Sequence, residues 1–312
     1  MLATLLIALA LATEGHANES ARIKQREFRV RAEDGVSIAV YEKRQAGSDE
    51  ALPVLLVHGT WSNASVWDFP GRSVMDHLAR RGFDVYALDL RGMGDSDKPD
   101  YGDIGLLERT RDVTAVVRHI RAATGHRPVV MGWSQGALLA GLVAAQNGHL
   151  LRGVGLLSAP GDGFFAPPPL QAILAGVVAS GAESYLPPPE ILFAIGFGTD
   201  PGTGAPTIGS SAFSSFVAGS EADSIRVILE MADLASFRTF MSAAWPAITI
   251  PALVVDGGQD LIVGEARATA LFQALGSERK HLIIFQRNAH TWFLEDNFAS
   301  TMRAFDAFLD QF

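Results

Sequence analysis

Short, nearly continuous runs of apolar residues recur along this chain and alternate with longer stretches of helical periodicity. A run that is apolar at every position suits a strand buried on both faces of a sheet. Strands that alternate with helices predict a mostly parallel α/β sheet. The strands are expected at residues 54–57, 85–90, 128–133, 154–157, 252–255 and 281–285, after a hairpin at 28–41; the helices are expected at 66–81, 106–124, 135–147, 265–275 and 292–312.

One long segment breaks this alternation. No Lys or Arg occurs from Gly153 to Ile225, where two Pro-Pro-Pro triplets, a Gly-rich stretch and several Phe residues lie instead. A long insertion into a compact domain is usually a lid or a binding element. We therefore predict an α/β core over residues 24–160 and 248–312. Residues 161–247 are predicted to form an inserted cap or lid, called here the cap segment.

The composition excludes several classes of function. The chain has 312 residues, with 25 Lys and Arg against 34 Asp and Glu, which gives a net charge of −9. This acidic balance argues against a nucleic-acid partner, because binding to phosphates needs clustered basic residues. The chain has no Cys, which excludes disulfides, thiolate metal sites and a Cys nucleophile. No later stretch is long and apolar enough to predict an integral membrane span.

The N-terminus resembles a secretory signal. Leu2 to Leu11 form an apolar run of signal-peptide length, and small residues at cleavage-site spacing follow it, ending in Gly15-His16-Ala17. We predict a signal peptide over residues 1–17, and hence export to the periplasm or the medium. No basic residue precedes the apolar run, so an N-terminal helix of a cytoplasmic protein is the alternative.

The pattern Gly132-Trp133-Ser134-Gln135-Gly136 lies where a predicted strand ends and a predicted helix begins. A Ser on such a sharp turn has strained backbone angles, and the flanking glycines leave room for the turn. The helix N-terminus behind the Ser offers N–H groups to a developing anion. The strand before and the helix after distinguish this pattern from a chance match, so Ser134 is predicted to be a nucleophile.

A Ser hydroxyl needs a base before it can attack. His290 follows the last predicted strand, 281–285, in a loop from which an imidazole could reach Ser134. We predict His290 as this base. His58, at the end of an earlier strand, is expected to hold its own loop instead.

The base in turn needs a carboxylate that orients the imidazole. Asp260 follows the strand 252–255 and gives the chain order Ser, Asp, His. We predict Asp260 in this role. Asp162, after the preceding strand, and Asp256 remain alternatives.

The oxyanion formed by such a nucleophile needs two N–H donors. We predict the backbone N–H of Gln135, the residue after the nucleophile, and that of Thr60, in the loop after the strand 54–57. The N–H of Trp61 is the second choice in that loop. The side chains of Trp61 and Trp133 are expected to line a substrate pocket together with the cap segment.

With these motifs the chain resembles the α/β-hydrolase superfamily. The resemblance implies an eight-stranded sheet, a cap after the sixth strand, and a Ser134/Asp260/His290 triad that works without a cofactor. Ala289 departs from the pattern, since many relatives carry Gly before the His. The residues that carry the resemblance are His58-Gly59-Thr60-Trp61, Asp89 to Pro99, Gly132 to Gly136, Gly257-Gly258-Gln259-Asp260 and Ala289-His290.

These residues predict a serine hydrolase that cleaves a carboxylic ester or a lactone, with a small molecule as its substrate. Relatives that cleave carbon–halogen bonds or epoxides use Asp at the position of Ser134. A carbon–carbon bond hydrolase, a cofactor-free haloperoxidase-like enzyme and a non-catalytic ligand-binding scaffold remain as alternatives. Neither a Gly-x-Gly-x-x-Gly pattern nor a His-Glu-x-x-His pattern occurs, so no cofactor and no metal site are predicted.

Overall fold

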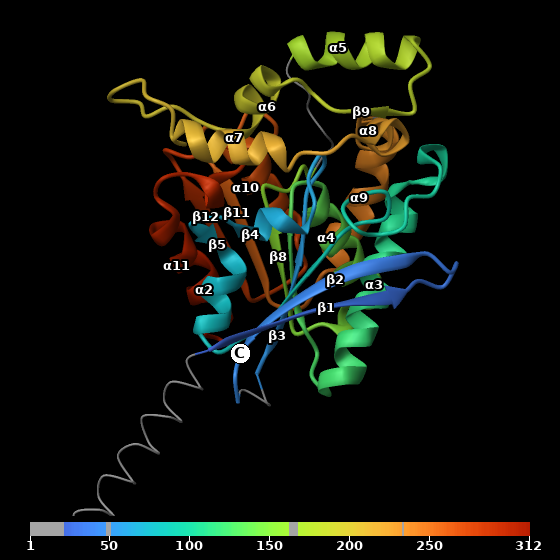
Figure 1. The fold of residues 1–312 in the computed structure, drawn as a ribbon, viewed down its shortest axis with the longest axis vertical. Helices are drawn as coiled ribbons and strands as arrows, with labels where there is room; N and C mark the ends of the chain where they lie inside the picture. Colours follow the sequence, from blue (N-terminus) through green and yellow to red (C-terminus); the bar gives the residue numbers. More distant parts are fainter. Residues whose placement is uncertain (1–21, 48–50, 162–167, 233) are drawn as a thin grey trace, which may run out of the picture.

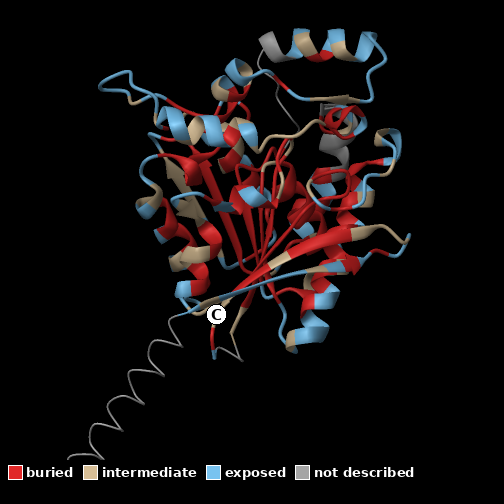
Figure 2. Cartoon of the chain, viewed as in Figure 1, coloured by how far each residue is buried: buried red, intermediate tan, exposed pale blue. Residues whose placement is uncertain are grey.

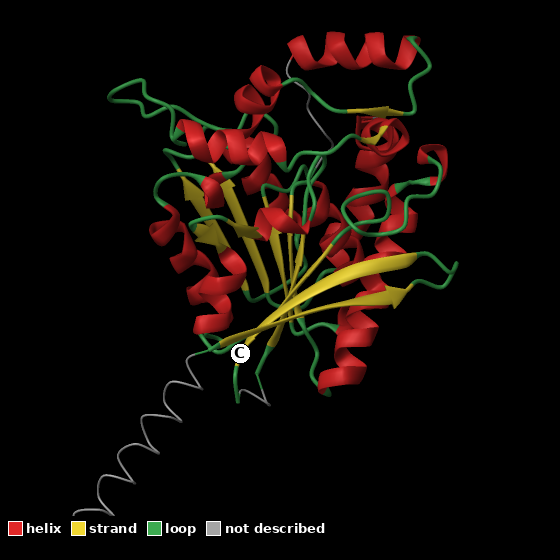
Figure 3. Ribbon diagram, viewed as in Figure 1, coloured by secondary structure: helices red, strands yellow, loops and turns green. Residues whose placement is uncertain are grey.

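The computed structural model of the protein describes residues 22–47, 51–161, 168–232 and 234–312. The predicted signal peptide lies outside these described residues. At the centre is an eight-stranded sheet in the order β1-β2-β6-β3-β7-β8-β11-β12 (Figure 1, Figure 3). Its strands are β1 (Ile23–Arg31), β2 (Ser37–Gln45), β3 (Pro53–Val57), β6 (Asp84–Leu88), β7 (Val129–Trp133), β8 (Gly153–Leu157), β11 (Ala252–Gly257) and β12 (Lys280–Phe285).

The sheet is mixed but mostly parallel, as the sequence predicts. β2 pairs antiparallel with β1 and with β6, whereas the pairs from β6 through β3, β7, β8 and β11 to β12 are all parallel. Every residue of β3, β6, β7, β8 and β11 is buried (Figure 2). Continuous apolar runs therefore mark strands that are covered on both faces.

The strand β1 forms one edge of the sheet and differs from these inner strands. It pairs only with β2, and most of its residues are at least partly exposed. Five of its nine residues are charged: Lys24, Arg26, Glu27, Arg29 and Arg31.

Helices cover both faces of the sheet. In Figure 1, α2 (Val74–Arg80) and α11 (Phe298–Leu309) lie on the left, and α3 (Leu106–Thr124) lies on the right. α4 packs against β7, β8 and α3. The remaining core elements are α4 (Gln135–Asn147), α10 (Gly264–Ala274), the short strands β4 (Asp68–Phe69) and β5 (Arg72–Ser73), and the 3-10 helices η1 (Ala64–Trp67), η2 (Tyr101–Asp103), η3 (Gly148–Leu150) and η4 (Trp292–Leu294).

Two predicted helices are shorter in the structure. The helix expected at 66–81 forms only as α2, because Gly71 adopts a φ of 75° in a turn after Pro70 and joins β4 to β5. Ser73 then caps α2, since its Oγ accepts the Asp76 N–H at 2.9 Å. The helix expected at 292–312 is likewise broken between η4 and α11.

The elements of the cap segment from α5 to α8 lie beyond the carboxyl ends of the parallel strands, at the top of Figure 1, whereas α9 lies lower, beside the core. Its helix α9 packs against α4. There the Trp245 ring lies so close to Gly141 that a Cβ at this glycine would come within 2.4 Å of the ring. The cap segment contains α5 (Pro168–Ala179), β9 (Ser184–Tyr185), α6 (Pro189–Gly196), α7 (Ser210–Ala218), β10 (Asp223–Ser224), α8 (Ile225–Ala232) and α9 (Leu234–Ala247). Among the described helices, none has both the length and the apolar character needed to cross a bilayer.

Candidate active site

Ser134 lies at the sharp turn between β7 and α4. Its φ of 56° and ψ of −119° are unusual for a residue with a side chain, so the turn is strained. The two flanking glycines make the turn possible. A Cβ at Gly132 would come within 2.0 Å of the Gly136 carbonyl oxygen, and a Cβ at Gly136 within 2.2 Å of the Val57 carbonyl oxygen. The local sequence thus places the Ser134 hydroxyl at the carboxyl end of the sheet.

His290 and Asp260 meet at the same end of the sheet. His290 lies in the loop after β12, and its Nδ1 is 2.7 Å from Oδ2 of Asp260, in the loop after β11. The other oxygen of Asp260 accepts the N–H groups of Ile262 at 2.7 Å and Val263 at 3.0 Å. The carboxylate is therefore fixed on both sides, and it orients the imidazole.

The surroundings of Asp260 favour its charged form. Burial alone would raise the pKa of Asp260, but the charge of His290 and its hydrogen bond outweigh this effect. Together with the Val263 N–H, they lower the pKa of Asp260 below its usual value. Asp260 can therefore remain a carboxylate and can stabilise a positive charge on His290.

Asp256, one of the alternative acids, has a different environment. Its side chain is buried in β11, and neither of its oxygens accepts a hydrogen bond within the described chain. The nearby Ser158 hydroxyl donates to the His290 carbonyl at 3.1 Å instead. Burial, and then the charge of Asp260, raise the pKa of Asp256 well above its usual value. Asp256 thus favours the neutral acid, and Asp162, the other alternative, lies outside the described residues.

Ser134 and His290 line one small cavity, called here the serine cavity. Its volume is about 30 Å³. No hydrogen bond joins the two side chains in the described structure, so they share the cavity wall without being bonded. The wall combines core and cap residues: Thr60, Trp61, Trp133, Ser134, Leu192, Ile195, Gly196, Phe216, Ile262, His290 and Thr291.

The two predicted N–H donors lie beside each other. Within the described chain, the backbone N–H groups of Thr60 and Gln135 find no acceptor. The Gln135 side chain, which is buried, donates from Nε2 to Thr60 Oγ1 at 3.1 Å. His58 anchors the loop that contains Thr60, since its Nε2 accepts the Leu90 N–H at 3.0 Å. Neither backbone N–H group is therefore occupied by a protein acceptor in the described chain.

Three contacts around His290 were not apparent from the sequence. Trp133 lines the cavity, and its Nε1 also donates to the His290 carbonyl at 2.8 Å. The buried Glu295 accepts the N–H of Ala289 at 2.7 Å. Together with the hydrogen bond from Ser158 to the His290 carbonyl, these contacts give three hydrogen bonds that hold the His290 loop. Of these contacts, only that of Glu295 had a signal in the sequence, namely a carboxylate five residues after His290.

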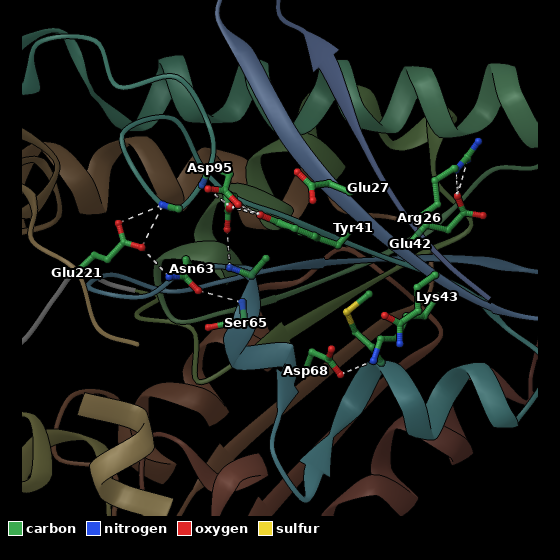
Figure 4. A pocket seen from close by; sticks show the side chains of 15 residues that line it. Arg26, Glu27, Tyr41, Glu42, Lys43, Asn63, Ser65, Asp68, Asp95 and Glu221 are labelled. Carbon is green, nitrogen blue, oxygen red and sulfur yellow. Dashed lines mark hydrogen bonds and ion pairs between the residues drawn. The ribbon is translucent and has the colours of Figure 1, made fainter. Parts of the chain in front are cut away.

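A larger hollow, of about 600 Å³, lies away from Ser134, beside β2 and α2 (Figure 4). Its polar groups mostly bind one another. Lys43 pairs with Asp68 at 2.6 Å, and the Tyr41 hydroxyl lies within hydrogen-bond distance, 2.9 Å, of an oxygen of both Asp89 and Asp95. This hollow holds no nucleophile with a base, so the serine cavity is the better candidate. The described residues contain no group of His, Asp and Glu side chains placed to hold a metal ion.

Comparisons with known proteins bear on the family and the fold of the chain. A family model described as "Alpha/beta hydrolase family" matches residues 54–303. Among curated proteins, a multifunctional-autoprocessing repeats-in-toxin protein of Vibrio cholerae is 28% identical over 141 residues. The match covers 44% of this chain but only 3% of the toxin, so this chain spans a small fraction of that protein's length.

Solved structures share the fold at low sequence identity. An esterase from Exiguobacterium antarcticum is 18% identical with a TM-score of 0.69, over 91% of this chain and 100% of the esterase. An enol-lactonase from Burkholderia xenovorans is also 18% identical, with a TM-score of 0.64 over 91% of this chain and 100% of the lactonase. At such identities the likeness extends to the fold and not to the substrate.

Proposed function

The chain belongs to the alpha/beta hydrolase family, and from this premise we propose that it is a serine hydrolase that cleaves a carboxylic ester or a lactone. One observation carries the proposal. The nucleophile on a strained turn and a carboxylate-bound imidazole border the same cavity. Nucleophilic catalysis by Ser needs this combination of groups.

In the first half of the proposed reaction, Ser134 Oγ attacks the carbonyl carbon of the substrate. His290 Nε2 takes the hydroxyl proton, because its Nδ1 is already bound to Asp260. The carbonyl π electrons move onto the oxygen, where the N–H groups of Gln135 and Thr60 stabilise the negative charge. His290 then gives its proton to the leaving alcohol, and an acyl-enzyme remains.

In the second half, water replaces the alcohol. His290 removes a proton from the water, the hydroxide attacks the acyl carbon, and Ser134 leaves with the proton from His290. The hydrogen bond between Ser134 and His290 that proton transfer needs is expected to form when substrate is bound. The apolar wall formed by Trp61, Leu192 and Ile195 excludes bulk water from the acyl group.

The direct test is Ser134→Ala in the full chain, with hydrolysis of p-nitrophenyl acetate and labelling by a fluorophosphonate as readouts. We expect activity and labelling to be lost, while Ser180→Ala, at an exposed position outside the cavity, behaves like the parent protein. Hydrolysis by the Ser134→Ala protein at the parent rate would contradict the proposal. Absence of labelling in the parent protein would favour a non-catalytic scaffold.

The cavity favours esters over the substrates of carbon–carbon hydrolases. Such substrates carry a carboxylate that needs a basic partner, and none of the described residues of the cavity wall is Lys or Arg. Arg226 lies elsewhere, where it pairs with Glu230 at 2.9 Å. A panel that contains a dienoate substrate and simple esters separates the two activities.

Export is a further part of the proposal, and it rests on the apolar run Leu2 to Leu11. Expression of the full chain, followed by N-terminal sequencing of the protein from the periplasm or medium, tests it. A mature N-terminus after Ala17 or Ala12 supports export. Retention of the whole chain in the cytoplasm would contradict it.

A further inference from the structure

A buried ion pair joins the cap segment to the core next to Ser134. Asp223, in β10, accepts hydrogen bonds from Arg109 of α3, at 3.0 Å from Nη1 and 2.7 Å from Nη2. Both side chains are fully buried. The desolvation of two charges offsets most of their attraction, so a buried ion pair is weak evidence for a role in stability. A buried ion pair can instead hold the neighbouring groups in one specific conformation.

The group that this pair fixes is the amide of Gln135. Arg109 Nη1 donates to Gln135 Oε1 at 2.5 Å, which leaves the amide nitrogen to face the other way. That nitrogen donates to Thr60 Oγ1 at 3.1 Å and approaches Asp223 Oδ2 at 3.5 Å. A chain of hydrogen bonds thus runs from the cap segment through α3 to both residues assigned to the oxyanion hole.

The same stretch of the cap segment holds the Thr60 loop from a second side. Two residues before Asp223, the Glu221 N–H donates to the Trp61 carbonyl at 3.1 Å. The Glu221 carboxylate accepts a hydrogen bond of 2.6 Å from Asn63 (Figure 4). The loop from Thr60 to Asn63 is therefore held by Gln135 at one end and by Glu221 further along.

We propose that Asp223 is a positioning residue for the oxyanion hole: through Arg109 and Gln135 it fixes Thr60, so that the hole is complete only when the cap segment is docked. This inference rests on the proposed function and adds a role for the cap segment in the chemical step. Asp223 does not line the serine cavity and acts only through the residues that it holds.

The expected effect is on the transition state rather than on the bound substrate. Loss of one oxyanion donor lowers kcat by roughly 10²–10³-fold, and a misplaced donor should cost less. For Asp223→Asn we expect kcat with p-nitrophenyl acetate to fall about 10- to 100-fold, with KM changed less than about threefold.

Two related ketones separate positioning from a general collapse of the site. Phenyl trifluoromethyl ketone is attacked by Ser134 to give a hemiketal whose oxyanion occupies the hole, with the Ser proton passing to His290. Acetophenone, which has a methyl group instead, binds without this addition. In Asp223→Asn the affinity for the trifluoromethyl ketone should fall by about the same factor as kcat/KM, while the affinity for acetophenone should not change.

A second variant covers the risk that Asp223→Asn does not fold, since it leaves Arg109 buried without a charge partner. Arg109→Met combined with Asp223→Leu replaces the pair by apolar side chains, which buried sites commonly tolerate. This double variant should keep the melting temperature near the parent value and show the same loss of kcat. Asp112→Asn is the matched control, because Asp112 forms a buried two-bond pair with Arg91, at 2.6 Å for each bond, but does not contact Gln135.

The outcomes also separate this inference from the proposed function. If Ser134→Ala is inactive but the double variant keeps the parent kcat and the parent affinity for the trifluoromethyl ketone, the positioning role is wrong and the serine mechanism stands. An equal loss of affinity for both ketones, or an equal loss of kcat in folded Asp112→Asn, would also overturn the positioning role. Activity of Ser134→Ala would overturn the proposed function itself.

Discussion

At the scale of single residues, the two buried carboxyl groups of Asp256 and Asp260 differ in their environments. Asp260 has a hydrogen-bond donor on each oxygen, whereas neither oxygen of Asp256 has one within the described structure. The same burial therefore leaves one group charged and makes the other favour its neutral form. Burial alone therefore does not decide which Asp keeps its charge beside the base.

This difference predicts opposite results for two isosteric variants. Asp260→Asn should lower kcat by roughly 10⁴-fold, because an amide at this position stabilises the wrong tautomer of His290. Asp256→Asn replaces a group that favours its neutral form, so kcat should stay within about tenfold of the parent value. Ester hydrolysis at neutral pH, with circular dichroism to confirm folding, measures both effects. A larger loss of kcat for Asp256→Asn than for Asp260→Asn would show that Asp256, and not Asp260, orients His290.

Glu295 predicts a pH dependence of stability. Its burial raises the pKa to about 7, from 4.5 for the free side chain, although the Ala289 N–H and other donors oppose this shift. A raised pKa means that the stabilising contribution is complete below pH 4.5 and is lost as the pH rises through 7. With about 1.36 kcal/mol per pKa unit, the free energy of unfolding should fall by about 3 kcal/mol over this window because of Glu295.

The comparison with Glu295→Gln isolates this contribution. Urea unfolding of both proteins from pH 4.5 to 7.5 gives the difference in the free energy of unfolding at each pH. The parent protein should lose stability relative to the variant as the pH rises. Parallel stability curves would mean that Glu295 titrates normally in the folded protein.

The residue scale also separates what the sequence can predict of the site from what it cannot. Ser134, His290 and Asp260 each follow a strand, so their place at one end of the sheet follows from parallel strand order. The link between Arg109 and Asp223 has no such signal. It joins a core helix to the cap segment, whose helices and strands the sequence pattern does not predict.

At the scale of elements, the helices with clear boundaries match their predicted ranges. α3 and α4 begin and end at the predicted residues: α3 follows Gly105 and ends before Gly125, and α4 starts at the strained turn. The predicted helix at 66–81 was wrong in its first half, because helical periodicity in a short window outweighed the turn signal of Pro70 and Gly71. Short local patterns therefore fail where a turn interrupts them.

The side chains of α6 are expected to limit the size of the acyl group that the serine cavity accepts. Leu192 and Ile195 of α6 line a cavity of about 30 Å³, which is about the volume of one small group. Acetyl esters should therefore be preferred to hexanoyl esters. Leu192→Ala or Ile195→Ala should shift the ratio of kcat/KM for hexanoyl over acetyl by about tenfold or more.

A series of p-nitrophenyl esters of increasing chain length measures this shift. Leu174→Ala in α5 is a suitable control, because Leu174 is buried but does not line the serine cavity. An unchanged preference in both α6 variants, or an equal shift in Leu174→Ala, would show that α6 does not limit the acyl group.

At the scale of the whole molecule, burial is unevenly distributed between the core and the cap segment. α4 is buried along most of its length, whereas α5 is exposed at most of its described residues (Figure 2). A helix with few buried contacts opens at a lower free energy than a core helix. The outer part of the cap segment is therefore expected to open independently of the sheet.

Hydrogen exchange measured by mass spectrometry checks this expectation. Peptides from α5 should exchange faster than peptides from α4 by at least about tenfold, with α9 closer to α4 because it packs against that helix. Equal protection in α5 and α4 would show that the two parts open as one cooperative unit.

The charged edge strand β1 has a consequence for the protein at high concentration. An edge with free N–H and C=O groups can recruit the same edge of another copy and extend into a fibril. β1 carries four cations and one anion, so pairing of two such strands would bring mostly like charges together, and the resulting repulsion opposes fibril growth. The protein should accordingly stay dispersed at low ionic strength and lose part of this protection in concentrated salt.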